Sequence, residues 1–153
     1  MGETNIIRKA EKRDIGILAD LLGSLFAIET DFAIDVQSQQ QGLLLLLEEP
    51  ERACIMVAER DNRIVGMCTG QILVSTAAGG LKVIVEDVVV AQGMRGRGIG
   101  TELITAIEHW SRACGVKRMD LLADRRNSPA LDFYRQRDWR STELVALQKP
   151  LLV

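Results

Sequence analysis

The sequence predicts one mixed α/β domain, a central mixed sheet of six to seven strands flanked by about four helices. Runs of β-branched residues alternate along the chain with segments in which apolar residues recur at helical spacing. The 153 residues are enough for one domain with its own core, which we expect to span residues 1–153. Apolar residues make up 47% and charged residues 26%, the proportions of a globular protein.

Each expected element follows from its apolar spacing and from the residues that begin or end it. Asp14 can cap a helix, and Pro50 stands just past the end of another. Asp61-Asn62 is a hairpin turn signal between two strand-like runs. Asn127 or Ser128 can cap the last helix, with Pro129 in its first turn. The expected order is a strand at 5–10, helices at 17–25 and 36–49, strands at 53–59, 63–74 and 83–90, a helix at 99–114, a strand at 116–123, a helix from 127, and one or two strands at 139–148.

Composition and spacing exclude several classes of protein. A net charge of −2 argues against nucleic acid as a partner, and the apolar run at 43–47 is far too short to cross a membrane. Cys54, Cys68 and Cys114 match no zinc or disulfide pattern, so we expect small buried hydrophobes in a reducing cytoplasm and no bound metal. His109 lies on the polar side of a predicted helix, and we assign it no role.

The stretch from Val83 to Gly100, VIVEDVVVAQGMRGRGIG, predicts a buried strand, a glycine-rich turn and the start of a helix. The first amides of such a helix have no partner within it, and Arg95 and Arg97 add positive charge. This arrangement predicts a site for phosphate or pyrophosphate. The alternative is a plain glycine-rich connection from strand to helix.

Glu86 and Asp87 interrupt the apolar strand. Carboxylates within a buried strand are costly unless they are paired or solvated, so we expect a cleft to open beside them. Because adjacent strand residues point to opposite faces, the two acids are not expected to face the same cleft.

The glycine spacing fits neither the Walker pattern nor the dinucleotide fingerprint. It does fit R-x-x-G-x-G, at Arg95, Gly98 and Gly100, and so resembles the acetyl-coenzyme A motif of the GNAT N-acetyltransferase superfamily. A second stretch, NSPALDFY from Asn127 to Tyr134, is similar to the later coenzyme A segment of that family. The predicted order of elements is also that of the GNAT, acyl-coenzyme A N-acyltransferase fold. One departure from the family pattern is Asp138, which stands where the family often has glycine, in the turn after the last helix.

The resemblance implies a site for acetyl-coenzyme A (acetyl-CoA). In it, the strand backbone pairs with the pantetheine arm, the loop amides hold the pyrophosphate, Asn127 contacts the coenzyme arm, and Tyr134 lies near the sulfur. The expected cofactor-binding residues are Val88, Val89, Val90, Arg95, Gly96, Arg97, Gly98, Ile99, Gly100, Thr101, Asn127, Ala130 and Tyr134.

Glu86 is the expected general base, directly or through a water, and Tyr134 the acid that protonates the departing thiolate. The adjacent acids resemble those of polyamine acetyltransferases, which handle the amine. Asp87 is therefore expected to meet the substrate. Separately, Glu29, Asp31 and Asp35 make the segment 29–35 acidic, which suits a cationic amine, and Glu29 and Asp31 are expected to meet the substrate there. Each assignment has a structural alternative. Glu86 or Asp87 could pair with an arginine, Tyr134 could be a core aromatic residue, and residues 29–35 could be a solvated loop.

The expected activity is acetyl transfer from acetyl-CoA to a primary amine, such as a small molecule, a polyamine, a lysine or an N-terminal amine. Direct transfer in a ternary complex is expected because no nucleophile is evident. The alternatives are a non-catalytic acyl-CoA sensor, and transfer to an alcohol or of a longer acyl chain. Family analogy also suggests a homodimer, with residues 143–147 as an edge strand.

Overall fold

The computed structural model describes residues 4–29 and 33–152. The chain divides into two compact units, Met1–Leu121 and Leu122–Val153, and each is described by itself. The first holds the sheet with its covering helices, and the second holds one helix and the C-terminal segment. A single domain over the whole chain stays a prediction.

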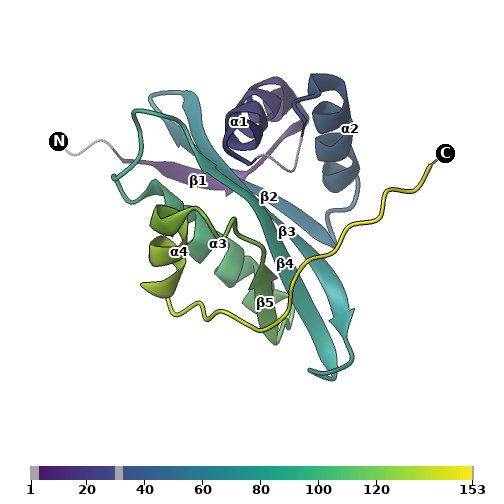
Figure 1. The fold of residues 1–153 in the computed structure, drawn as a ribbon. Helices are drawn as coiled ribbons and strands as arrows, with labels where there is room; N and C mark the ends of the chain where they lie inside the picture. The colour runs from purple at the N-terminus through teal and green to yellow at the C-terminus, as the bar shows by residue number, and fades with distance from the viewer. Residues whose placement is uncertain (1–3, 30–32, 153) are drawn as a thin grey trace. The chain divides into compact units, whose positions relative to one another are not determined.

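The first unit is built on a five-stranded sheet in the order β1-β2-β3-β4-β5 (Figure 1). Neighbouring strands are antiparallel except for β4 and β5, which are parallel and joined by a helical crossover, α3. The mixed α/β order predicted for this part of the chain is therefore confirmed. Its elements are β1 (Ile6–Lys9), a 3-10 turn (Lys12–Asp14), α1 (Ile15–Ile28), α2 (Val36–Leu47), β2 (Ala53–Arg60), β3 (Arg63–Ser75), β4 (Gly80–Val90), α3 (Ile99–Ala113) and β5 (Arg118–Leu121).

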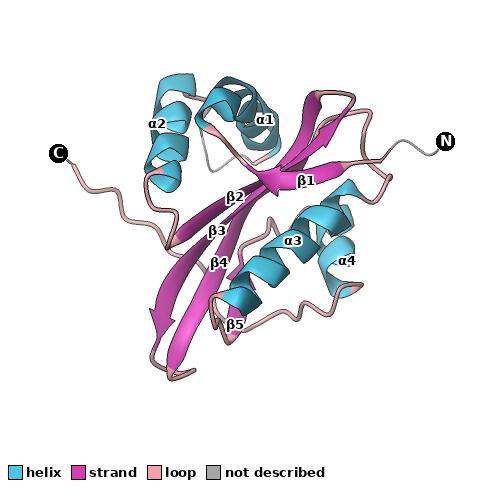
Figure 2. Cartoon of the chain, turned by 180° about the vertical axis from the view of Figure 1, so that it is seen from behind, coloured by secondary structure: helices cyan, strands magenta, loops and turns pink. Residues whose placement is uncertain are grey.

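Within the first unit, α1 and α2 lie on one side of the sheet and α3 lies on the other (Figures 1 and 2). One core cluster joins buried residues of α1 and α2, such as Leu18 and Leu43, to Met67 of β3 and Val89 of β4. On the opposite face, α3 packs so closely that a Cβ atom on Gly66 would lie 3.1 Å from Leu103. The sheet therefore has an α1/α2 face and an α3 face, and this division places the candidate site.

The β2–β3 hairpin turns where the sequence predicts. Arg60 pairs with Arg63, and Asp61 and Asn62 between them have φ angles of 50° and 60°. Two consecutive left-handed residues make the tight turn whose twist suits a hairpin, and Asp and Asn tolerate that conformation. This prediction is confirmed.

Asp14 does not cap α1 with its side chain, contrary to the prediction. Its carboxylate instead accepts hydrogen bonds from the Glu11 amide at 2.7 Å and from the Arg8 guanidinium at 2.8 and 3.1 Å. Arg8 also donates to Glu59 at 2.9 Å. A nearby arginine binds a buried carboxylate more strongly than an exposed helix amide does, and the result is an ion-pair network between β1, β2 and the start of α1.

In the second unit, α4 spans Ser128–Arg135 and Asn127 is its cap, as predicted. The strands predicted at 139–148 are absent, so over residues 4–29 and 33–152 the sheet has five strands rather than six to seven. Leu144, Val145 and Leu147 are 77–89% exposed, because no neighbouring strand buries them. Their β-like pattern alone does not make a strand, since a strand is stable only when it is paired.

Candidate active site on strand β4

A bulge in β4 lies at the two acids. Glu86 pairs with Thr69 and Val89 pairs with Met67, so Asp87 and Val88 together oppose the single residue Cys68. Asp87 has a φ angle of 55°, a left-handed conformation that is uncommon for a residue other than glycine. A bulge of this kind re-aims the side chains of its strand.

The bulge brings both acids to one face of the sheet. Glu86 lies directly opposite Thr69, and directly opposed residues in antiparallel strands project to the same side. The Asp87 carboxylate also reaches the Thr69 hydroxyl, at 3.1 Å. Thr69 is two residues from Met67, which belongs to the α1/α2 core, so this is the α1/α2 face. The expectation that the two acids face opposite ways is therefore wrong.

Their surroundings differ, although their positions are adjacent. Glu86 is exposed, whereas Asp87 is partly buried and Thr69 is fully buried. Burial, followed by the neighbouring Glu86 charge, raises the pKa of Asp87 to about 6, and the hydrogen bond from Thr69 opposes this rise. A carboxyl with such a pKa is a carboxylate at neutral pH and still basic enough to accept a proton. Thr69 was not singled out from the sequence, because only the strand register brings it to Asp87.

Beyond the bulge, one edge of β4 is open. β5 pairs with Lys82–Val85 and ends at Leu121, opposite Val85. Within the described residues, no strand pairs with that edge of β4 from Glu86 to Val90. The backbone of Val88, Val89 and Val90 therefore presents an edge on which an extended ligand could lie as a further strand.

The open edge runs directly into the glycine-rich loop and α3. Gly96 and Gly98 have φ angles of 74° and 81°, and Gly98 is the N-cap of α3 without any side-chain cap. Gly98 thus has no side chain with which to cap α3, and the N-terminal amides of a helix are the groups that an anion site uses. The Arg95 Nε atom donates to the Val90 carbonyl at 3.2 Å, which holds this arginine beside the end of β4.

The expected residues of this loop lie together, while those of α4 belong to the second unit. Arg95 and Arg97 are exposed, and Gly100 and Thr101 lie in the first turn of α3. In the second unit, the Asn127 Oδ1 atom accepts from the Ala130 amide at 3.2 Å, so its side-chain nitrogen is the group that can donate to a ligand. The Tyr134 ring makes edge contacts with Phe133 and Trp139, at centroid distances of 5.2 and 6.0 Å.

The three acids of the segment 29–35, which were expected to attract a cationic amine, differ in their surroundings. Asp31 lies outside the described residues. Asp35 caps α2 by accepting from the Ser38 amide and hydroxyl, at 3.3 and 2.7 Å, which is a structural role. Glu29 follows the end of α1 as its C-cap residue and is partly buried, whereas the neighbouring Ile28 is 47% exposed.

Cys54 and Cys68 are buried, as expected, and do not form a nucleophilic site, whereas Cys114 is only partly buried, contrary to the expectation. Burial raises the pKa of Cys54 to about 11, and raises that of Cys68 further. The Cys68 thiol contacts the Leu103 carbonyl at 3.6 Å on the α3 face, and after burial and Cys54 the Asp87 charge also raises its pKa. Across the described residues, no group of three or more His, Cys, Asp or Glu side chains could hold a metal ion. In the same residues, no helix is both long and apolar enough to span a membrane.

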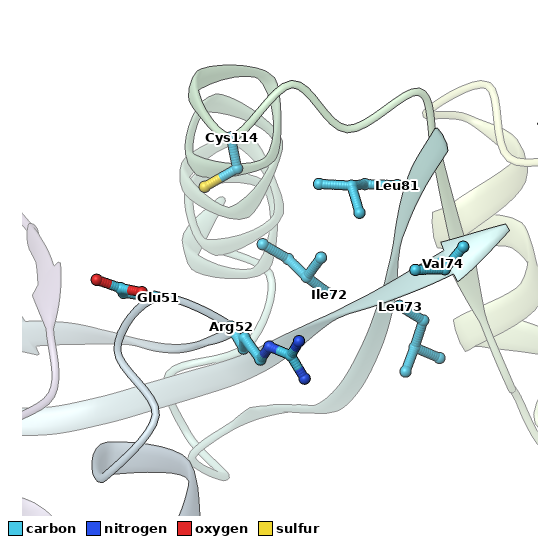
Figure 3. A pocket seen from close by; sticks show the side chains of 7 residues that line it. All are labelled: Glu51, Arg52, Ile72, Leu73, Val74, Leu81 and Cys114. Atoms are coloured by element: carbon cyan, nitrogen blue, oxygen red, sulfur yellow. The ribbon is translucent and has the colours of Figure 1, made fainter. Parts of the chain in front are cut away.

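A separate surface hollow of about 530 Å³ lies at the other end of β4, about 30 Å along the strand from the glycine-rich loop. It is mainly apolar, and Figure 3 shows its lining side chains around the end of α3 and the start of β2. The hollow is therefore not part of the candidate site formed by Glu86, Asp87 and the glycine-rich loop. Its lining residues are Glu51, Arg52, Ile72, Leu73, Val74, Leu81 and Cys114.

A protein-family model matches most of the chain. The model of the family described as "Acetyltransferase (GNAT) family" matches residues 20–139. Among curated proteins, none matches the sequence significantly.

Solved structures share the fold over nearly the whole chain. The aminoglycoside N-acetyltransferase AAC(6')-Iy, in complex with CoA, is 18% identical with a TM-score of 0.85, covering 98% of this chain and 97% of its own. A possible acetyltransferase from Clostridium difficile 630 is also 18% identical, with a TM-score of 0.84 and coverage of 99% and 100%. The aminoglycoside acetyltransferase meta-AAC0020, from an uncultured soil metagenomic sample, is 26% identical, with a TM-score of 0.74 and 97% coverage of both chains.

Proposed function

The chain belongs to the GNAT family of acetyltransferases, and on that premise we propose that it moves an acetyl group from acetyl-CoA to a primary amine by direct transfer. As a member of this family, the protein is an acyltransferase. The observation that carries the proposal is the open edge of β4 from Glu86 to Val90, which leads into the loop at the N-terminus of α3. That edge suits an extended arm, and the loop suits the diphosphate at its end.

In the proposed complex, the backbone of Val88–Val90 pairs with the pantetheine arm. The amides from Arg95 to Thr101, together with the Arg95 and Arg97 side chains, hold the pyrophosphate. Asn127 donates to the coenzyme arm through its side-chain nitrogen, and Ala130 contacts the arm through its methyl group, because its amide already donates to Asn127.

For the general base we propose Asp87, with Glu86, which the sequence favoured, as the alternative. Asp87 has the buried carboxyl with the raised pKa, and the bulge turns it to the α1/α2 face beside the open edge. The amine loses its proton to this carboxylate as its nitrogen bonds to the thioester carbon. The bond from that carbon to sulfur breaks, and the thiolate takes a proton from Tyr134. Cys54 and Cys68 are buried thiols with raised pKa values, which supports transfer without a covalent enzyme intermediate.

We propose a cationic small-molecule amine as the acceptor class. Two adjacent carboxylates on one face favour a positively charged substrate. Two of the similar structures are aminoglycoside acetyltransferases, which act on polycationic amines of this kind. Glu29 and Asp31 are the further acids proposed to meet the amine. A cytoplasmic location, a homodimer and independence from nucleic acid remain predictions.

The test has two stages. Titration calorimetry with acetyl-CoA and CoA is expected to show binding, and absence of binding at near-millimolar concentration would overturn the proposal. A thiol-release screen over aminoglycosides, polyamines, amino acids, peptides and alcohols then identifies the acceptor. Turnover with an amine supports the proposal. Binding without turnover on any acceptor would instead support the acyl-CoA sensor.

A further inference from the structure

Thr69 occupies an unusual position in the bulge. Its side chain is 1% exposed, and its hydroxyl oxygen lies 3.1 Å from two acceptors, the Glu86 carbonyl oxygen and the Asp87 carboxylate. A hydroxyl has one hydrogen to donate and two lone pairs with which to accept. Thr69 therefore cannot donate fully to both groups at once.

We propose that Thr69 is a positioning residue for acetyl transfer, and that its hydroxyl holds the Asp87 carboxyl toward the amine in both protonation states of that carboxyl. The inference rests on the proposed role of Asp87 as the base. Thr69 itself touches neither of the reacting atoms and acts through Asp87.

The hydrogen bonds balance in each state. When Asp87 is ionised, the Thr69 hydroxyl donates its hydrogen to the carboxylate. When Asp87 has taken a proton from the amine, the carboxyl donates that proton to the Thr69 oxygen, and the Thr69 hydrogen turns to the Glu86 carbonyl. The Asp87 carboxyl thus keeps Thr69 as its hydrogen-bond partner throughout the transfer. The Glu86 carbonyl receives the Thr69 hydrogen only when the Asp87 carboxyl is protonated.

The charges around Asp87 leave this hydroxyl as the group that favours its ionised form. Glu86 on β4 opposes ionisation, and the Cys68 thiol of β3, which senses the Asp87 charge, has a pKa raised mainly by burial and is a neutral thiol at neutral pH. On α1, which packs on the same face, the charged residue is Asp20, and it is exposed. Glu102, Glu108, His109 and Arg112 belong to α3, on the opposite face of the sheet. The Thr69 hydrogen bond lowers the pKa of Asp87 against burial and the Glu86 charge.

The experiment compares Thr69→Val, which keeps the shape and removes the hydroxyl, with Thr69→Ser, which keeps the hydroxyl. For Thr69→Val we expect the acidic limb of the kcat/KM profile to move to higher pH by about half a unit or more. The loss of activity is then several-fold near pH 6 and smaller near pH 8. Thr69→Ser restores the midpoint. A Thr69→Val profile with an unshifted midpoint, whatever its height, would overturn the proposal.

A second measurement separates this inference from the proposed function. NMR titration of the Asp87 side-chain carbon gives the same midpoint in the full chain without any turnover. If the wild type acetylates no acceptor, the proposed function fails, while the titration of Thr69→Val still decides whether Thr69 governs Asp87. If Thr69→Val does not fold, Thr69→Cys, whose thiol is a weak donor, is expected to shift the carboxyl titration in the same direction. An unshifted Thr69→Cys titration would count against the proposal.

Discussion

The Asp87 carboxylate lies 3.1 Å from the Thr69 hydroxyl, across a bulge that places Asp87 on the same face of the sheet as Glu86. In a regular strand these adjacent acids would point to opposite faces. Here the left-handed backbone at Asp87 turns its carboxyl to the side that α1 and α2 cover. One acid is thereby partly buried next to a second, exposed acid, and this difference leads to the first two predictions.

Asp87→Asn is expected to reduce kcat by about a hundredfold or more, because a neutral amide cannot accept the amine proton. Asn tolerates the left-handed backbone, so the affinity for CoA measured by calorimetry should stay unchanged. In the wild type, kcat/KM should rise with pH through about 6, as the Asp87 carboxyl ionises.

The matched variant is Glu86→Gln. It removes the charge that helps to raise the pKa of Asp87, so the midpoint of the kcat/KM profile should move to lower pH. The plateau should fall only through a higher KM for the cationic amine, while kcat changes little. The reverse outcome, in which Glu86→Gln is inactive and Asp87→Asn is active, would assign the base to Glu86.

Asp87→Asn should also stabilise the folded protein at neutral pH. Burial and the Glu86 charge raise the pKa of Asp87 from 3.8 to about 6, so the folded state favours the neutral carboxyl. The stability that this group contributes is fully present below pH 3.8 and is lost as pH rises through about 6. Asp87→Asn, which is neutral at every pH, should therefore raise the free energy of unfolding at pH 7.5 by about 3 kcal/mol, with the difference becoming small near pH 4.

Urea unfolding at the two pH values measures this difference, and Asp120→Asn is the control of opposite sign. Burial raises the pKa of Asp120, but hydrogen bonds from Arg118 and Lys82 lower it further, so its net shift is downward. Removing that charge should destabilise the fold at pH 7.5. An Asp87→Asn variant that is less stable than the wild type at pH 7.5 would contradict the assigned shift.

Gly98→Ala is expected to weaken binding of CoA by tenfold or more. The φ angle of Gly98 is 81°, and an alanine there costs about 1–2 kcal/mol of backbone strain, or moves the first amides of α3 out of place. Gly79→Ala is the matched control, because Gly79 has a φ angle of 65° in the β3–β4 turn and open space around it. Both variants should lose similar stability, and calorimetry should find weaker CoA binding in Gly98→Ala alone. Equal CoA affinities in the two variants would remove the loop from the site.

The parts of the fold and of the site that the sequence predicted correctly are those set by residues adjacent in sequence. The turn at Asp61-Asn62 and the loop from Arg95 to Gly100 follow from local backbone preferences, which the residue types express directly. The bulge at Asp87 depends on the register between two long strands, and one extra residue there reverses the alternation on which the sequence argument relied. Thr69 could not be found without that register.

The C-terminal segment shows the opposite error. Leu144, Val145 and Leu147 have the composition of a strand, and the sequence therefore predicted one. Composition shows only that a segment is compatible with a strand. A strand also needs a neighbouring strand to pair with, and these residues are exposed because they are not paired in this way. Asp14 was misread for a related reason, because its carboxylate is bound by Arg8 rather than by the helix it precedes.

Arg8→Met is expected to lower the free energy of unfolding by about 3 kcal/mol at pH 7, because it leaves the Asp14 carboxylate buried without its cation. The hydrogen bond from Arg8 lowers the pKa of Asp14 below 3.8, so the stability from this pair is present above that pH and is lost as pH falls through the lower, folded-state value. The difference between variant and wild type should therefore shrink in acid. Arg13→Met, which breaks an exposed pair with Glu11, should cost less than about 0.5 kcal/mol. Urea unfolding of both variants at pH 7 and pH 3 decides the matter, and equal losses for Arg8→Met and Arg13→Met would show that the network around Asp14 does not hold β1 to the start of α1.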